Sequence, residues 1–264
     1  MRKYLAIFRT ALQSSITWRG AFWFYVSLSF LPLIAYYYLW TAVFQNRAEA
    51  AGFSYHSLLT YAVVALLITR FTSSWPEFGV MENIREGTLT KYLVQPTSYL
   101  GYFFTSRVAF RVFANLINAP FAMLIIYVLR DRLLPPATGW QWLATMLAIP
   151  IAYVMQFLLG MLLGLVSFWI SEARYLIPLK ETALLFVGGM ALPYAFFPAA
   201  VQTMLDALPF KYLAAFPVEI FLGQKTAAEA IAGLAVGLIW LGALFALMKL
   251  MWRRGLKKFV AVGN

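Results

Sequence analysis

The run from Ala21 to Phe44 contains 24 residues and no charged side chain. As a helix it would be roughly 36 Å long, enough to cross a hydrocarbon core of about 30 Å with some tilt. Of the whole chain, 62% is hydrophobic and only 12% is charged, whereas a soluble domain is about 45–50% apolar and about 25% charged. The sequence therefore excludes a disordered chain, a coiled coil and an ordinary cytosolic enzyme. It predicts an all-α polytopic membrane protein with one transmembrane domain, residues 1–264.

Apolar stretches that are long enough to span a membrane recur along the chain, and we expect six of them. After the fifth, three prolines (Pro198, Pro209 and Pro217) interrupt an apolar region. Proline lacks a backbone N–H and breaks a helix, so we expect short re-entrant outer helices over residues 198–228. The expected spans are Ala21–Phe44, Ser57–Ser74, Arg107–Leu129, a fourth from about Trp140 within Leu133–Ser171, Leu176–Phe197 and Ala230–Met248.

Residues 1–19 carry four basic side chains and no acidic one. Tyr4, Leu5 and Phe8 begin a series of apolar residues at helical spacing, with Arg2 and Arg9 mostly on the other side. This pattern predicts an amphipathic helix that lies in the cytoplasmic membrane interface. A frayed, basic N-terminus is the alternative.

The distribution of the 21 Lys and Arg residues predicts the topology. If the N-terminus is cytoplasmic, 14 of them fall inside and five outside, with Arg70 and Arg111 at the inner ends of spans. Cytoplasmic loops of membrane proteins collect Lys and Arg, so we expect both termini inside. The net charge of +11 then indicates an anionic leaflet as partner, and no nucleic acid.

Catalytic and metal-binding motifs are missing from the sequence. There is no P-loop, no His-Glu-x-x-His and no Gly-x-Ser-x-Gly motif, and His56 is the only histidine. With no cysteine, disulfides and thiolate chemistry are excluded. The acidic residues all fall in expected loops or at span ends, whereas a self-powered carrier usually has an ionisable or unwound site near the midplane. Energy for uphill transport would therefore come from another subunit.

Two patterns concern contacts between spans. Arg111, Asn115 and Asn118 share one helix face, and either hydrogen bonds between helices or a place on the translocation path would explain them. Gly160-x-x-x-Gly164 and Gly233-x-x-x-Gly237 permit close helix approach. We expect packing within one subunit, with a dimer face as the alternative.

The connection between spans two and three, Pro76–Pro96, combines charges of both signs with repeated apolar residues. We expect a helix around Glu82–Glu86, a break at Gly87 and a second helix that ends before Pro96. A plain connecting loop needs no apolar anchors, so a docking element for a soluble partner is favoured.

The string Glu82-Asn83-Ile84-Arg85-Glu86-Gly87-Thr88-Leu89, followed by Tyr92-Leu93 and Pro96, resembles the cytoplasmic signature of ABC-2 type permeases. The basic N-terminal helix, Trp18-Arg19-Gly20 before a long first span, and six spans with a broken outer region are also similar to that family. The resemblance covers essentially the whole chain.

The resemblance implies a permease subunit of an ATP-driven transporter, usually an exporter, in a bacterial cytoplasmic membrane. Separately, the 9 Trp, 15 Tyr and 23 Phe residues could accommodate an apolar or amphipathic substrate, with lipid, drug, peptide and glycan all left open. Two P-loop ATPase subunits would bind ATP and Mg and dock at segment 75–106, and a second permease, the same or different, would pair with this chain. The chain itself would bind no cofactor and catalyse no reaction, and Phe196 and Phe197 would form an outer gate. The residues implied at or near the ATPase contact are Glu82, Ile84, Arg85, Glu86, Gly87, Leu89, Tyr92 and Leu93.

Three classes of function remain to be distinguished. A self-sufficient channel or secondary carrier would show flux from this chain alone. A membrane-embedded enzyme would need paired acids, metal ligands or an activated nucleophile, which the sequence lacks, and a scaffold would need none of these. A co-purifying P-loop ATPase would favour the permease.

Overall fold

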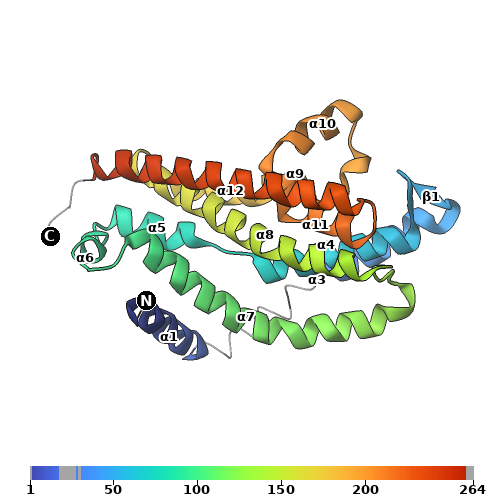
Figure 1. The fold of residues 1–264 in the computed structure, drawn as a ribbon, viewed down its shortest axis with the longest axis horizontal. Coiled ribbons are helices and arrows are strands. Elements are labelled where there is room, and N and C mark those ends of the chain that lie inside the picture. The colour runs from blue at the N-terminus through green and yellow to red at the C-terminus, as the bar shows by residue number, and fades with distance from the viewer. Residues whose placement is uncertain (1, 18–27, 29–30, 260–264) are drawn as a thin grey trace.

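The computed structural model describes residues 2–17, 28 and 31–259. The described residues form an elongated bundle whose helices run mostly along its long axis (Figure 1). The beginning of the first expected span, Ala21–Phe44, lies outside the described residues. Its described part is α3 (Leu31–Val43), followed by the 3₁₀ turn η1 (Phe44–Asn46).

The two ends of the bundle carry different elements (Figure 1). At one end, which we call the basic end, lie α1 (Arg2–Thr17), α6 (Thr90–Leu93) and the C-terminal end of α12 (Ala227–Leu256). At the other, the hairpin end, β1 (Glu49–Ala50) pairs antiparallel with β2 (Phe53–Ser54). The segments expected in the cytoplasm thus lie at one end of the bundle.

Four helices in the described part of the chain are long and apolar enough to cross a membrane. They correspond to the second, third, fourth and sixth expected spans, and support a multi-pass membrane protein. Their bounds are Tyr55–Arg85, Tyr99–Arg132, Gly139–Phe168 and Ala227–Leu256.

The second of the expected spans continues into the segment that we had assigned to a connection. Helix α4 (Tyr55–Thr72) is followed after three residues by α5 (Pro76–Arg85). Pro76 stands at the start of α5. A backbone N–H at this position would have no acceptor within the helix, so proline costs no hydrogen bond here. The two helices therefore form one apolar unit that reaches from the hairpin end to the basic end.

Helix α7 (Tyr99–Leu129) begins two turns before the expected start at Arg107, so the expected boundary was wrong. The hydroxyl of Ser98 accepts a hydrogen bond from the backbone N–H of Gly101 at 3.0 Å. This N-cap satisfies an N–H that the first turn leaves without a partner. At the other end of α7, η2 (Arg130–Arg132) leads toward α8.

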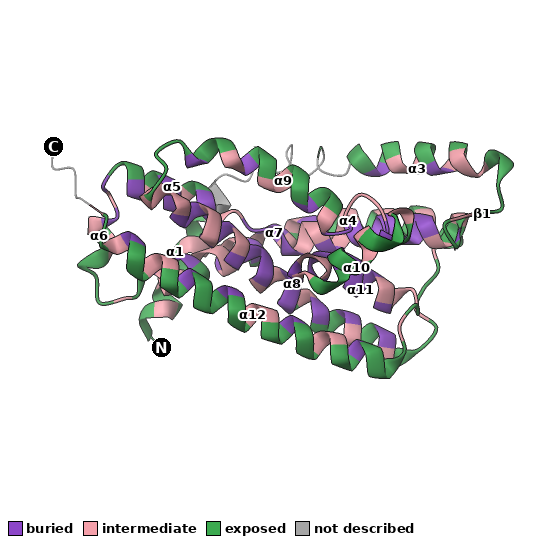
Figure 2. Ribbon diagram, turned by 90° about the horizontal axis from the view of Figure 1, so that it is seen from above, coloured by how far each residue is buried: buried purple, intermediate pink, exposed green. Residues whose placement is uncertain are grey.

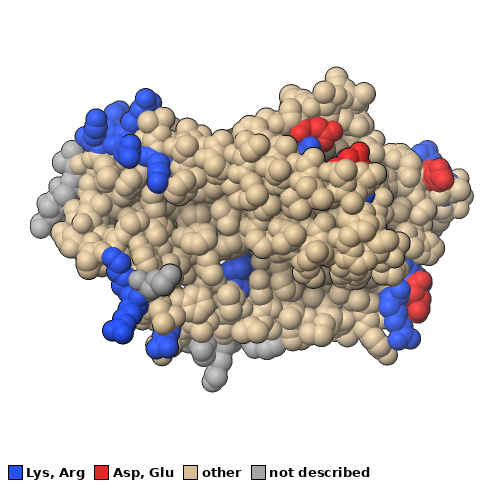
Figure 3. Space-filling model, viewed as in Figure 1, with Lys and Arg blue, Asp and Glu red and all other residues tan. Residues whose placement is uncertain are grey.

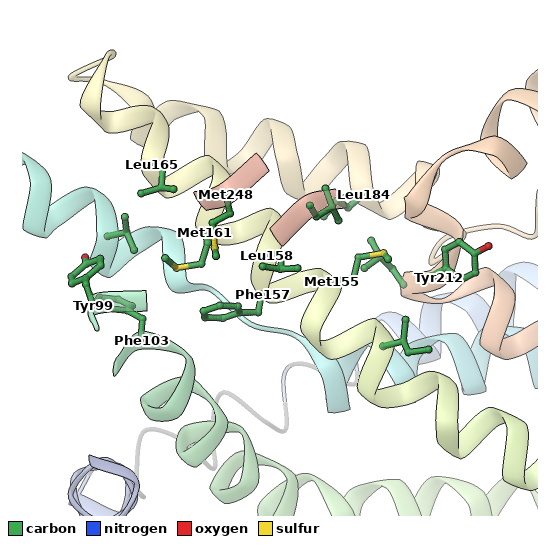
Figure 4. Packing of buried hydrophobic residues seen from close by; sticks show 14 of the residues in the cluster. Tyr99, Phe103, Met155, Phe157, Leu158, Met161, Leu165, Leu184, Tyr212 and Met248 are labelled. Atoms are coloured by element: carbon green, nitrogen blue, oxygen red, sulfur yellow. The ribbon is translucent and has the colours of Figure 1, made fainter. Parts of the chain in front are cut away.

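Helix α8 (Gly139–Leu165) corresponds to the fourth expected span and is the central element of the core. Figure 4 shows Met155, Leu158 and Met161 of α8 among side chains of neighbouring helices. Figure 2 shows the contrast with α3 and α12, which expose much of their surface. Apolar side chains such as Leu116 and Ile239, 69% and 70% exposed, suit contact with lipid.

The fifth expected span, Leu176–Phe197, is wrong as a continuous helix. After η3 (Val166–Phe168) and η4 (Ala173–Tyr175), α9 (Leu176–Val187) has only 12 residues, roughly 18 Å. Gly188 follows, and Gly189 adopts φ +68°, a conformation that favours glycine. The N–H groups of Gly188, Gly189 and Met190 donate to carbonyls of the last turn of α9, so the helix ends in a glycine cap. The Gly189 carbonyl accepts a hydrogen bond from the Tyr61 hydroxyl at 2.6 Å.

The proline-interrupted region contains short helices, as the sequence indicated. The deepest is α11, in which Phe216, Val218 and Ile220 are buried. Pro217 lies in its first turn, where proline is tolerated. The elements are η5 (Tyr194–Phe196), α10 (Ala199–Ala207), η6 (Pro209–Leu213) and α11 (Ala215–Phe221).

Both glycine pairs pack inside the chain. A side chain at Gly160 or Gly164 would collide with Pro76, Glu77 or Val80, so α5 lies directly against α8 at these positions. Gly233 and Gly237 of α12 make room for aromatic side chains of the proline-interrupted region, Phe216 and Tyr212. The expectation of packing within one subunit thus describes what these motifs do here.

Candidate functional site

The turn between α5 and α6 lies at the basic end (Figure 1). Helix α5 ends at Arg85, and Gly87 has φ +71°, so the break falls at the glycine where we expected it. Asn83 fixes the turn because its backbone carbonyl accepts from the N–H of Leu89 at 3.0 Å, and its side-chain oxygen accepts from the Thr88 hydroxyl at 3.0 Å. Its amide donates to the Tyr99 hydroxyl of α7 at 3.2 Å.

The role of Asn83 was missed from the sequence. Its position four residues before Gly87 is a usable signal, since Asn side chains often hydrogen-bond nearby backbone at helix ends and turns.

The eight residues expected at the ATPase contact divide by exposure. Leu89 is fully buried and Ile84 is buried, so these side chains anchor the turn from within. Tyr92 is half-buried and packs against the rings of Tyr99 and Tyr102. Gly87 is buried as well, whereas the exposed members are Glu82, Arg85, Glu86 and Leu93.

A hollow of about 200 Å³ lies beside these exposed residues. From α5 it is lined by Phe78, Glu82 and Arg85, and from the connection between α8 and α9 by Glu172 and Arg174. Charges of both signs around a partly apolar hollow suit a protein partner with complementary charges. The contribution of Glu172 and Arg174 was missed, although their charges follow the fourth expected span on the same side.

Helix α5 is joined to α9 by a buried ion pair. The Nζ of Lys180 lies 2.5 Å from a carboxylate oxygen of Glu77, whose side chain is 0% exposed. Lys180 is 12% exposed and also lies 2.8 Å from Glu181. We had placed Glu77 in a loop or at a span end, but it lies inside the bundle against Gly160.

The polar face of α7 contacts the end of α4. Arg111 donates a hydrogen bond to the carbonyl of Arg70 at 2.8 Å, and Asn115 donates to the carbonyl of Phe71 at 3.1 Å. The last carbonyls of a helix have no intrahelical donor, so these side chains satisfy the C-terminal turn of α4. Asn118, on the same face, is buried. These contacts support the reading as hydrogen bonds between helices, and a place on the translocation path stays a prediction.

The proposed gate residues lie toward the hairpin end. The ring of Phe196 packs against Trp40 and Phe53, with centroids 5.6 and 6.3 Å apart. Phe197 packs instead against Tyr194 at 6.4 Å. The two neighbouring rings thus belong to different contacts, and only Phe196 joins the aromatic cluster with α3 and β2.

The surface charge separates the two ends of the molecule. Figure 3 shows basic side chains gathered at the basic end, basic and acidic ones together toward the hairpin end, and a largely uncharged surface between them. In the part of the chain that the structure describes, no three His, Asp or Glu side chains come together as a potential metal site. The charged surfaces thus lie at the two ends of the molecule, and the surface between them is mostly apolar.

Comparison with known proteins supports this description. A family model described as ABC-2 family transporter protein matches residues 30–263. Comparison with curated proteins and with solved structures finds no match. The matched range covers all of the long apolar helices, together with α5 and the connection between α8 and α9, which line the hollow at the basic end. The chain therefore belongs to the ABC-2 transporter family, as a multi-pass permease subunit of an ABC transporter that associates with an ATP-binding partner.

Proposed function

We propose that this chain forms the export pathway of an ATP-driven transporter in a bacterial cytoplasmic membrane, and moves an apolar or amphipathic substrate outward. Two ATPase subunits, which bind ATP and Mg, dock at the basic end, and a second permease subunit completes the pathway. Both termini then lie in the cytoplasm, and the chain crosses the bilayer six times. Because α9 is short, the fifth crossing consists of α9 and the residues that follow it. The hollow lined by Phe78, Glu82, Arg85, Glu172 and Arg174 is the observation that carries this proposal.

The contacts of α5 explain how a push at the basic end reaches the bundle. The helix lies directly against α8 at Gly160 and Gly164, and the ion pair between Glu77 and Lys180 joins it to α9. Close-packed elements move together, because a packed interface does not deform continuously. Closure of the ATPase dimer would therefore tilt α5, α8 and α9 as one body.

The outer end of the proposed pathway is closed at the hairpin end. Phe196 packs with Trp40 and Phe53, so it joins the segment after α9 to α3 and to the hairpin. If α9 tilts with α5, this aromatic contact is the one that must open. We propose Phe196, with Phe197 beside it, as the outer gate, and the polar face with Arg111, Asn115 and Asn118 as part of the path.

The test is a charge reversal beside the hollow at the basic end, where the ATPase is proposed to dock. Arg85→Glu changes an exposed charge that lines the hollow, so we expect it to weaken capture of the ATPase from native membranes and to lower ATP-dependent transport in proteoliposomes. Arg130→Glu, an equally exposed reversal in η2, is the matched control and should leave both readouts unchanged.

Cross-linking gives a direct readout of the contact. Because the chain has no cysteine, Glu172→Cys creates a single thiol, which should cross-link to the ATPase subunit while a cysteine at Arg130 should not. Transport by the purified chain in vesicles without ATPase, or equal capture of the ATPase by both charge reversals, would refute the proposal.

A further inference from the structure

A groove lies between α1, α5 and α7 at the basic end, beside the contact of α1 with α7. It encloses about 640 Å³. On the α1 side it is lined by Ala6, Thr10 and Ser14, which recur every four residues and so share one helix face. Their small side chains leave the space open, although Tyr4 packs closely on Gly101 at the start of α7.

The floor of the groove combines aromatic rings with one cation. Phe103, Phe110 and Arg107 line it from α7, and the Arg107 guanidinium lies 6.0 Å from the centre of the Phe103 ring. Within the described part of the chain, this guanidinium forms no ion pair and no hydrogen bond. The residues outside the described part contain no Asp or Glu.

The nearby carboxylates leave Arg107 without a partner. Glu77 acts on it electrostatically but is already paired with Lys180. Glu82 lines the same groove from the α5 side without reaching the guanidinium. The guanidinium of Arg107 is half-buried and has five N–H donors, whose geometry matches that of a phosphate group. An anionic ligand at this position would therefore supply the acceptors that the nearby carboxylates do not.

We propose that the groove binds a membrane phospholipid, whose phosphate sits on Arg107. The glycerol and the first acyl carbons would contact Phe103 and Phe110, and hydroxyl or amine groups of the headgroup would reach Glu82 and Asn83, which also line the groove. The lipid source follows from α1, whose Arg2, Lys3 and Arg9 are exposed, as expected of a helix beside an anionic leaflet. The bound lipid would join α1 to α5 and α7.

The experiment is a titration of the detergent-purified chain with dioctanoyl phosphatidylglycerol, followed by native mass spectrometry. No ATPase is present, so the outcome is independent of the proposed transport function. We expect Arg107→Gln to weaken binding by about tenfold or more. Arg9→Gln, the same substitution on the exposed face of α1, should bind as the wild type does.

A second variant protects the test against a folding defect. Thr10→Leu places a larger side chain in the groove from an exposed position on α1 and leaves Arg107 unchanged. It should therefore also reduce lipid binding. Equal affinity of the wild type and Arg107→Gln would overturn the proposal. Equal binding of dioctanoylglycerol would overturn the phosphate contact, and equal competition by inorganic phosphate alone would overturn the lipid as its source.

Discussion

The buried ion pair between Glu77 and Lys180 makes a prediction about stability that depends on which partner is removed. Glu77 is 0% exposed and one of its oxygens, Oε2, is buried without a hydrogen-bond partner. Lys180 has a second carboxylate, Glu181, at 2.8 Å. Removing Lys180 therefore leaves a fully buried carboxylate, whereas removing the Glu77 charge leaves Lys180 still paired.

The expected magnitudes follow from this asymmetry. Lys180→Met should lower the free energy of unfolding by about 3–5 kcal/mol, the usual cost of leaving one member of a buried pair alone. Glu77→Gln keeps the shape and an oxygen that can accept from Lys180, so it should cost only about 1–2 kcal/mol. In the double variant the isolated charge is gone, and the loss should be smaller than the sum of the two.

The assay is unfolding of the purified chain from dodecylmaltoside micelles by increasing sodium dodecyl sulfate, followed by circular dichroism. The control is Lys211→Met, which removes a lysine paired with an exposed partner, Asp206, at 3.3 Å, and should cost no more than about 1 kcal/mol. If the Glu77 and Lys180 variants lost equal stability, or if their effects simply added, the reasoning from burial would be refuted.

Three further predictions use the same unfolding measurement. Leu89→Ala removes a fully buried side chain and should cost about 2–4 kcal/mol, whereas Leu93→Ala, at 44% exposed, should stay within about 0.5 kcal/mol; similar losses would contradict the placement of Leu89. Gly189→Ala should destabilise by more than about 1 kcal/mol because of its positive φ and crowded surroundings, while Gly242→Ala in open helix surface should be neutral or gain up to about 1 kcal/mol. Burial raises the pKa of Glu219, and a lysine ion pair opposes it only in part, so the folded chain holds this proton more tightly than the unfolded chain. Its contribution to stability is therefore lost as pH rises from about 4.3 through the raised pKa, and Glu219→Gln should flatten that part of the pH profile; an unchanged slope would rule out this origin.

The long helices and the break between α5 and α6 could be predicted from the sequence because their causes are local. An uncharged apolar run of sufficient length has few alternatives to a membrane helix. Both α8 and α12 follow that rule, although α12 extends beyond the expected end at Met248 to Leu256. Gly87 breaks α5 from α6 for a reason that its own backbone supplies.

Other features depend on partners far away in the chain. The early end of α9 has a local signal in Gly188-Gly189, which we had not used, but the donor to the Gly189 carbonyl, Tyr61, lies 128 residues away. The burial of Glu77 depends on Lys180, 103 residues away, and on a glycine of α8. No local pattern contains this information.

The sequence by itself determined that the chain is a membrane protein, where most of its long helices lie and where its positive charge gathers, because hydrophobicity, charge and glycine act over a few neighbouring residues. Only the tertiary structure decided which side chains of segment 75–106 face outward, which carboxylate is buried, and where Arg107 meets an open groove. The physical reason is that the energy of a charged or polar group depends on what surrounds it in space, and that surrounding exists only after the helices pack.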